Sequence, residues 1–380
     1  ARKNPDASPF LGLAAFQEGD ADRFFGREQD VAMALSRLDD RPFVTLAGPS
    51  GIGKSSFLRA GVVPALRSLG AWDVVIMRPG RAPLTGLVQA LSGIDAQQVL
   101  GPHDDAGVAA VVKRAKAEPG YVGASVRAIA QQRGTKVLIF VDQFEETFTN
   151  ASVEERVGFV QTLLGIADDV SSPLRVIASI RSDFIDRANE HPQLMEAMTR
   201  GLMFLRPLGR SSLTDALAQP LAQVGYKFED DALLEQMIGE LSQTASALPL
   251  LQFAANSLWE QRDRTQRKLT RAAYNALGGI GGALANHAES IVAGLSTQQQ
   301  NVFRQVVLRL VTAEGTRAVA ERSELEALGA PGTVAPLLDL MIGGRLLAAD
   351  SDSTDARLEL IHESLISHWP SLRRWREDLG

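Results

Sequence analysis

A glycine-rich segment carries the clearest chemical signal in the chain. Gly48 and Gly53 stand five residues apart, and Lys54 and Ser55 follow at once. In a Gly-x-x-x-x-Gly-Lys-Ser pattern, backbone N–H groups surround phosphate oxygens, the lysine reaches the β and γ phosphates, and the serine hydroxyl binds Mg²⁺. The spacing predicts a Walker A loop rather than an ordinary glycine turn. The residues expected at the phosphates are Gly48, Pro49, Ser50, Gly51, Ile52, Gly53, Lys54, Ser55 and Ser56.

An acidic residue ends a second apolar run. Val137 to Val141 is wholly hydrophobic, and Asp142 follows it directly. An acid at the carboxyl end of a buried strand lies beside the metal ion in P-loop proteins, which is the Walker B arrangement. We therefore expect Ser55 and Asp142 to hold Mg²⁺, the alternative being that Asp142 is a solvent-facing acid.

Three charged residues near these motifs are candidates for catalysis. Glu145 and Glu146 follow Asp142 closely, and either carboxylate has the chemistry to polarise an attacking water while the other serves as a cap or ion-pair partner. Arg181 ends the apolar run 174–180, where a side chain would reach the γ phosphate; a surface salt bridge explains it as well. The pattern thus predicts ATP hydrolysis, with Lys54, Asp142, Glu145, Glu146 and Arg181 as the catalytic set.

The preference for adenine over guanine follows from the absence of a motif. Guanine-reading Asn-Lys-x-Asp and Thr-Lys-x-Asp motifs are absent, because Thr135-Lys136-Val137-Leu138 has no acid in its fourth place. We therefore expect ATP and ADP as the ligands.

Strands and helices must alternate to position these residues. Five short apolar runs, separated by segments with helical spacing, predict a doubly wound parallel sheet of α/β class. The runs are 43–47, 73–77, 137–141, 174–180 and 202–205, and a helix is expected over 55–69 between the first two.

After residue 207 the strand signals stop, and the pattern becomes helical. Residues 1–207, with a lead-in over 1–42, are predicted to form the P-loop domain, and residues 208–277 a helical lid. The glycine-dense stretch 278–282 indicates a hinge or linker before a third domain, 278–380. That domain has two capping boxes, Ser296-x-x-Gln299 and Ser323-x-x-Glu326, a helix over 333–341 and a hairpin around 350–355, which suggests a winged helix.

Composition limits the classes of partner. The chain has 380 residues, which exceeds the usual size of one domain, and its net charge of -6 with a pI of about 5.5 gives no basic field for nucleic acid. It has no cysteine and no apolar run long enough for a membrane span, so we expect a cytoplasmic protein without membrane contact. Because it opens with Ala1 rather than Met, it is expected to be part of a longer protein.

In their order along the chain, these segments resemble the STAND class of AAA+-related NTPases, which includes the NACHT and NB-ARC switches, and in particular its bacterial multidomain members. The resemblance covers nearly the whole chain and rests, beside the Walker A loop, on Pro9 to Leu13, Phe24 to Glu28, Asp142 to Glu146, Ile361 to Leu365 and Trp369-Pro370.

The resemblance implies further residues of the P-loop domain at the nucleotide. Phe25, Gly26 and Arg27 match a segment near the adenine and ribose, and Arg181 matches the first sensor. Arg200 stands where AAA+ proteins often keep an arginine finger that acts across a subunit interface, although family members frequently lack one.

Two residues of the later domains also match. Pro249 corresponds to a helical-domain proline that packs on the base, but Ala247 replaces the usual glycine, and propensity alone makes Pro249 a helix-starting proline. His362 corresponds to a winged-helix histidine that contacts the β phosphate of ADP; the alternative is a histidine packed inside the winged helix.

The function that the resemblance implies is a slow ATPase used as a switch. It is closed with ADP, and with ATP it opens and self-associates to relay a signal in bacterial defence or cell death. An N-terminal effector and a C-terminal sensor are expected outside this chain. One alternative is a transcription regulator whose winged helix binds DNA, but the helix 333–341 contains no Lys or Arg. Another is a processive AAA+ motor, for which we find no pore-loop motif.

Overall fold

The computed structural model describes residues 7–49, 52–95, 99–241, 247–312, 315–349, 356–362 and 364–378. The chain forms two compact units: residues 15–208 make one, and the segment before Ala15 joins residues 209 onward in the other. The sequence pattern groups residues 1–42 as one lead-in, whereas the structure divides this segment between the units at Ala14.

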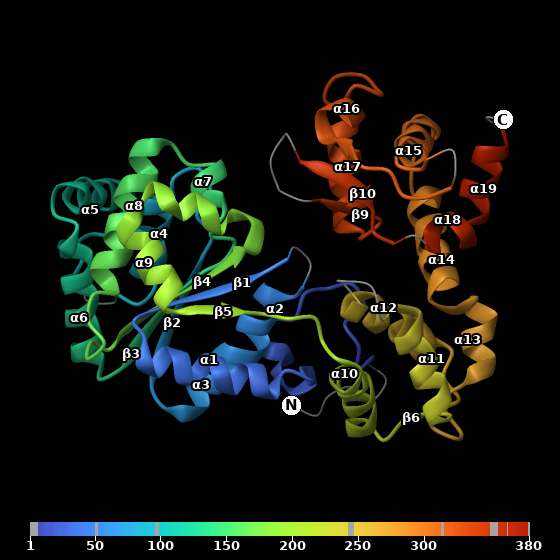
Figure 1. The fold of residues 1–380 in the computed structure, drawn as a ribbon, viewed down its shortest axis with the longest axis horizontal. Helices are drawn as coiled ribbons and strands as arrows, with labels where there is room; N and C mark the ends of the chain where they lie inside the picture. The colour runs from blue at the N-terminus through green and yellow to red at the C-terminus, as the bar shows by residue number, and fades with distance from the viewer. Residues whose placement is uncertain are drawn as a thin grey trace. The chain divides into compact units, whose positions relative to one another are not determined.

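A five-stranded parallel sheet forms the centre of the first unit (Figure 1), which confirms the predicted α/β class. The strand order is β2-β3-β4-β1-β5. Strands of such a sheet are covered on both faces, which is why each is a nearly continuous apolar run. The strands are β1 (Phe43–Gly48), β2 (Trp72–Met77), β3 (Lys136–Val141), β4 (Leu174–Arg181) and β5 (Leu202–Phe204).

Helices cover both faces of the sheet (Figure 1). Alternate side chains of β3 enter different cores: Val137 and Ile139 pack in one, Leu138 and Phe140 in the other. The first core is completed by α4 (Pro83–Ser92), α5 (Asp105–Ala117), α6 (Gly120–Arg133), α8 (Val153–Ile166) and α9 (Pro192–Arg200), with the short α7 (Glu146–Thr149) and the 3-10 helix Ser182–Glu190. The second is completed by α1 (Glu28–Asp40) and the helical segment after the glycine loop.

That helical segment departs from the single helix predicted over 55–69. It consists of α2 (Lys54–Ser56), a π-helical turn (Phe57–Val62) and α3 (Val63–Leu69). Pro64 lies in the first turn of α3. Because proline has no N–H to donate and its ring crowds the preceding turn, the regular hydrogen-bond ladder is interrupted just before it.

The second unit begins with the predicted helices α10 (Arg210–Gln223), α11 (Asp231–Leu241) and α12 (Ala247–Glu260), followed by α13 (Arg271–Leu277). The prediction of a wholly helical segment over 208–277 was wrong in one detail. Two short segments, β6 (Lys227–Phe228) and β7 (Lys268–Leu269), form a parallel pair. Each is only two residues long, and such a segment leaves no periodicity to detect in the sequence.

The glycine-dense stretch is a tight turn rather than an extended linker. Gly278 and Gly279 have φ values of 75° and 70°, which favour glycine, and α14 (Gly279–Ala293) starts at once. The capping box of Ser296 and Gln299 is confirmed at the start of α15 (Thr297–Arg309). The second capping box was wrong, because α16 (Arg322–Glu326) begins one residue before Ser323, directly after the strand β8 (Ala320–Glu321).

A three-stranded antiparallel sheet of order β8-β10-β9 accompanies these helices. Its other strands are β9 (Leu347–Ala349) and β10 (Arg357–Leu360), while the turn expected around 350–355 lies outside the described residues. The helix predicted over 333–341 is α17 (Val334–Gly343), and α18 (Ser364–His368) and α19 (Pro370–Glu377) follow. The winged-helix assignment stays a prediction. No helix in the described ranges is both long and apolar enough to span a membrane.

Candidate functional site

The glycine loop joins the carboxyl end of β1 to the first turn of α2, as the motif requires. Gly53 has a φ of 95°, a backbone conformation that favours glycine, and it stands just before Lys54. A Cβ on Gly48 would lie 3.1 Å from the carbonyl oxygen of Leu205 and 3.2 Å from Cγ2 of Ile52, so a larger side chain at this position would be crowded. Ser50 and Gly51, also predicted at the phosphates, lie outside the described residues.

The Lys54 side chain turns back onto the loop. Its Nζ donates to the carbonyl oxygens of Gly48, at 2.8 Å, and Pro49, at 2.9 Å. Burial lowers the pKa of the Lys54 ammonium, while the neighbouring Glu145 carboxylate acts in the opposite direction. Two carbonyl groups of the loop therefore hold the ammonium, and a bound phosphate would replace them as its partner.

Asp142 is the buried centre of the site, with an exposed fraction of 0%. Its Oδ1 accepts hydrogen bonds from the hydroxyls of Ser55, at 2.7 Å, and Ser179, at 2.8 Å. The Ser179 hydroxyl also accepts from the backbone N–H of Gln143 at 3.0 Å. These contacts join α2, β3 and β4 at the carboxyl edge of the sheet.

Sequence reasoning missed Ser179. The available signal was that Ser179 carries the only hydroxyl in the apolar run 174–180. The register of β3 against β4 pairs Val141 with Ala178, so Asp142 and Ser179 are the next residues along the two strands. Strand register depends on long-range pairing, which the sequence pattern did not specify.

Two arginines that were also missed face the other oxygen of Asp142. The guanidinium of Arg59 lies 3.4 Å from Oδ2, and Nε of Arg78 lies 4.0 Å from it. Arg59 follows Ser55 by four residues on the same helical segment, so the two side chains share a face. Arg78 comes directly after β2, the strand that pairs with β3.

The two candidate general bases have different surroundings. Glu145 accepts a hydrogen bond on Oε2 from the backbone N–H of Arg181 at 3.2 Å, and burial raises its pKa above the ordinary value of 4.5. Glu146 instead accepts on Oε2 from the backbone N–H of Gly80 at 3.0 Å. Glu145 thus belongs to the cluster around Lys54, whereas Glu146 anchors the turn after β2.

Arg181 forms the surface ion pair that the sequence left open as an alternative. Its Nε and one terminal nitrogen donate to the carboxylate of Asp183, at 3.1 Å and 2.6 Å, and its guanidinium lies 5.1 Å from the ring centroid of Phe184. The Arg181 charge nevertheless lies close enough to Lys54 to lower the pKa of that ammonium. Its predicted role as a sensor stays a prediction.

The segment predicted near the adenine is built mainly by internal contacts. The side chain of Arg27 is buried, and one of its nitrogens donates to Asp30 at 2.8 Å and to the carbonyl oxygen of Arg206 at 2.7 Å. Gly26, with a φ of 85°, donates its N–H to the side chain of Glu28. Phe25 is half-buried. The guanidinium of Arg27 is thus engaged with protein groups, so a contact with nucleotide would fall to the backbone or to Phe25.

The lead-in also contacts the helical segment that follows the glycine loop, at α2 and at α3. The backbone N–H of Phe16 donates to the hydroxyl of Ser56 at 3.2 Å, and Glu18 forms an ion pair with Arg67 at 3.0 Å. The Ser56 hydroxyl, predicted at the phosphates, is therefore occupied by the lead-in.

Arg200, at the end of α9, pairs with Glu196 one helical turn earlier, and both are exposed.

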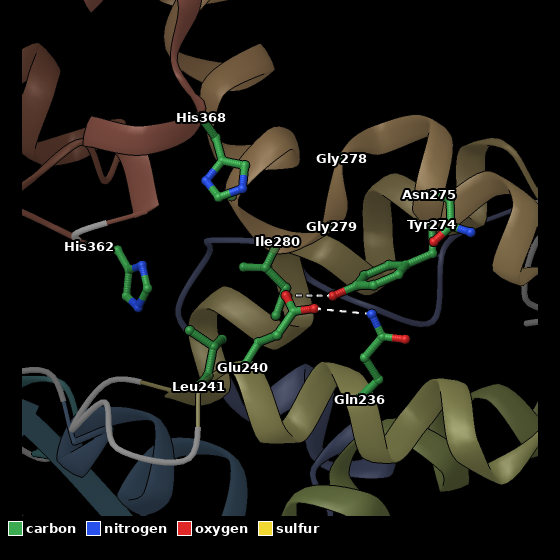
Figure 2. Close-up of a pocket in the computed structure, with 11 residues that line it drawn as sticks. Gln236, Glu240, Leu241, Tyr274, Asn275, Gly278, Gly279, Ile280, His362 and His368 are labelled. Carbon is green, nitrogen blue, oxygen red and sulfur yellow. Dashed lines mark hydrogen bonds between the residues drawn. The ribbon is translucent and has the colours of Figure 1, made fainter. Parts of the chain in front are cut away.

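Pro249 and His362 belong to the second unit. Pro249 is the third residue of α12, a position in the first turn that suits proline. His362 lines a pocket of about 470 Å³, on the wall that it forms with His368 (Figure 2). The pocket is also lined by Glu240, whose Oε2 accepts a hydrogen bond from the hydroxyl of Tyr274 at 2.8 Å, and by the Gly278–Gly279 turn. Contacts of Pro249 and His362 with nucleotide stay predictions.

The residues at Asp142 fit a magnesium ion of the P-loop kind. A serine hydroxyl and a buried carboxylate lie side by side at the helix start, and both are hard oxygen donors. Across the described ranges, no group of three or more His, Asp or Glu side chains could hold a metal ion by itself. Phosphate oxygens and water would supply the other ligands, as is usual for Mg²⁺.

The parallel sheet, the glycine loop at a helix start and the Ser55–Asp142 pair together define a P-loop NTPase. The sequence profile of the family named Novel STAND NTPase 1 matches residues 9–379, so the chain belongs to this family. No curated protein matches the chain.

The solved structures that are similar to this chain are distant from it in sequence. The ORC1 protein of Aeropyrum pernix, in complex with DNA, is 14% identical with a TM-score of 0.52, and the match covers 98% of each chain. A Walker-type ATPase of Pyrococcus abyssi is 14% identical with a TM-score of 0.48, covering 93% of this chain and 97% of that one. The Cdc6p protein of Pyrobaculum aerophilum is 14% identical with a TM-score of 0.45, covering 93% and 94%. The ORC1 likeness shows a shared fold.

Proposed function

We propose that this chain is a nucleotide-controlled switch: compact with ADP, and opened by ATP into a form that self-associates. The observation that carries the proposal is the cluster at the carboxyl edge of the sheet, where Lys54, Asp142 and Glu145 come together. Membership of a STAND NTPase family supports the assignment. Hydrolysis would be slow, since its task is to reset the switch.

Each residue of the cluster has a role in this proposal. Lys54 leaves the Gly48 and Pro49 carbonyls and donates to the β and γ phosphates. Ser55 and Asp142 would hold Mg²⁺, and Ser179 fixes the carboxylate. When bound, Mg²⁺ neutralises charge on the phosphate oxygens.

Glu145 is the better candidate for orienting the attacking water. Its raised pKa moves it toward the range in which a base accepts a proton at neutral pH, and it lies within the field of Lys54. Glu146 is engaged with Gly80 and so keeps the turn after β2 in place. Arg181 would leave Asp183 and contact the γ phosphate, which makes it the sensor of hydrolysis.

The second unit would sense which nucleotide is bound. Pro249 would pack on the adenine, together with the backbone of Gly26 and Arg27, and His362 would donate to the β phosphate of ADP. A difference of a few kcal/mol in nucleotide affinity between the closed and open forms suffices to exchange their populations. The signal, the effector and a role in bacterial defence or cell death would depend on domains outside this chain, in the cytoplasm.

DNA binding is the less favoured function. The helix that would enter a groove, α17, has no Lys or Arg, and its Asp339 forms an ion pair with Arg322 at 2.8 Å. With a net charge of -6, the chain also lacks the positive charge that phosphate backbones require. A motor function has no pore-loop motif to support it.

The proposal is tested by the nucleotide that the purified chain carries. We expect denaturation to release ADP, measured by chromatography at close to one equivalent, and steady-state hydrolysis to be slow. Protein that holds no nucleotide and binds neither ATP nor ADP would contradict the proposal, and rapid turnover by the isolated chain would favour a motor.

A further inference from the structure

The two oxygens of Asp142 have partners of different kinds. Oδ1 accepts hydrogen bonds from two neutral hydroxyls, those of Ser55 and Ser179. Oδ2 faces two cations, the guanidinium groups of Arg59 and Arg78. The hydroxyl side orients the carboxylate, and the arginine side compensates its charge, which a fully buried carboxylate needs.

The two arginines are held differently. The side chain of Arg59 is 25% exposed, and its guanidinium lies 5.8 Å from the centroid of the Phe140 ring. The side chain of Arg78 is 54% exposed and lies farther from Oδ2, although the turn that follows it is fixed by the Gly80–Glu146 hydrogen bond. Arg59 is therefore the principal counterion of Asp142, and Arg78 the weaker one.

A magnesium ion in this site would depend on Oδ2, the oxygen of Asp142 that faces the two arginines. Oδ1 already accepts two hydrogen bonds, so a metal-bound water would have to use Oδ2, on the side that faces Arg59. A guanidinium and a divalent cation repel each other strongly at such short range in a buried site. Both cations gain from Asp142, but each weakens the attraction that the other feels.

We propose that Arg59 is a positioning residue that competes with Mg²⁺ for Asp142. This inference rests on the proposed nucleotide site and adds a regulatory property to it. Arg59 neutralises Asp142 when magnesium is scarce, so the phosphates of a bound nucleotide are not repelled by the carboxylate. The same charge raises the concentration of magnesium needed to complete the site. The chain therefore retains its nucleotide with less dependence on magnesium than a site without this arginine.

The test compares nucleotide affinity with and without magnesium, using the fluorescent probe N-methylanthraniloyl-ADP. In Arg59→Gln we expect weaker binding in EDTA, because Asp142 then repels the phosphates. The magnesium concentration that gives half of the full effect should fall about tenfold, because Mg²⁺ no longer competes with a cation. Arg78→Gln should change both quantities in the same direction but less.

Two controls separate this role from general packing. Arg59→Lys keeps the charge and should restore both quantities to those of the wild type. Arg67→Gln removes an arginine of the neighbouring helix whose partner is Glu18, and it should change neither. If Arg59→Gln fails to fold, as judged by circular dichroism, Arg78→Gln carries the test.

An unchanged or higher magnesium requirement in Arg59→Gln, or in Arg78→Gln where that variant carries the test, overturns this inference while leaving the proposed function intact. A wild-type chain that binds no nucleotide under either condition overturns both.

Discussion

The hydroxyl of Ser55 donates a 2.7 Å hydrogen bond to Oδ1 of Asp142, a residue 87 positions away in the sequence. This contact joins the Walker A and Walker B motifs directly. A short hydrogen bond to a buried carboxylate is charge-assisted, and it fixes the direction of both side chains. The Ser55 hydroxyl and the Asp142 carboxylate, which would hold magnesium, are therefore already oriented by the protein.

Ser179→Ala should destabilise the chain by about 1–3 kcal/mol, because Asp142 and the Gln143 N–H both lose a partner in a buried place. Urea unfolding measures this change. Thr45→Val, in the adjacent strand β1, is the matched control: within the described structure the Thr45 hydroxyl has no hydrogen-bond partner, so its removal should be neutral or stabilising. Equal losses in both variants would contradict the role given to Ser179.

Lys54→Ala should weaken the affinity for ADP by about 10- to 100-fold, which corresponds to the loss of a charge-assisted hydrogen bond to phosphate. Titration with a fluorescent nucleotide measures it. Lys136→Ala removes an exposed lysine at the start of β3, far along the strand from Asp142, and should leave the affinity unchanged. Wild-type affinity in Lys54→Ala would contradict the phosphate assignment.

Glu145→Gln should lower the rate of ATP hydrolysis by about 100-fold or more while nucleotide binding is retained, because only the general base is lost. Single-turnover hydrolysis separates the two effects. Glu146→Gln is the comparison, and we expect a smaller decrease because that side chain contacts Gly80. The opposite order of the two rates would assign the base to Glu146.

Glu145→Gln should also change how the stability of the chain depends on pH. The pKa of Glu145 is raised by burial in the folded chain, so the unfolded state ionises first as the pH rises through the ordinary value of 4.5. The contribution of the Glu145 carboxyl to the free energy of unfolding is thus lost as the pH rises from its pKa in the unfolded chain toward its higher pKa in the folded chain. Glu145→Gln should stabilise the nucleotide-free chain at about pH 7.5 and have little effect at about pH 4, measured by urea unfolding. A gain of equal size at both pH values would show that ionisation is not the cause.

His362→Leu should promote ATP-dependent self-association, because the proposed contact that holds the ADP form is lost. Gel filtration in the presence of ATP measures the change in size. His368→Leu alters the other histidine of the same pocket and should leave the size unchanged. If neither variant differs from the wild type, the role of His362 as a sensor is excluded.

The sequence by itself determined the elements of the phosphate site. A glycine loop between an apolar strand and a helix is a local pattern, so Gly48, Lys54 and Ser55 could be assigned without knowledge of the rest of the chain. Asp142 followed from the same reasoning, because a carboxylate after a buried parallel strand must lie at the edge where the loop lies. The five strands were found because burial on both faces makes each of them apolar.

Only the tertiary structure decided what surrounds Asp142. Ser179 reaches it through the register of β3 against β4, and Arg78 through the pairing of β2 with β3. The different contacts of Glu145 and Glu146 likewise depend on which backbone N–H groups the neighbouring strands bring near. Neither register nor these contacts has a local cause, because they arise from pairing between strands that are far apart in the sequence. The sequence therefore determined which residues bind phosphate, and the fold decided which charges they encounter there.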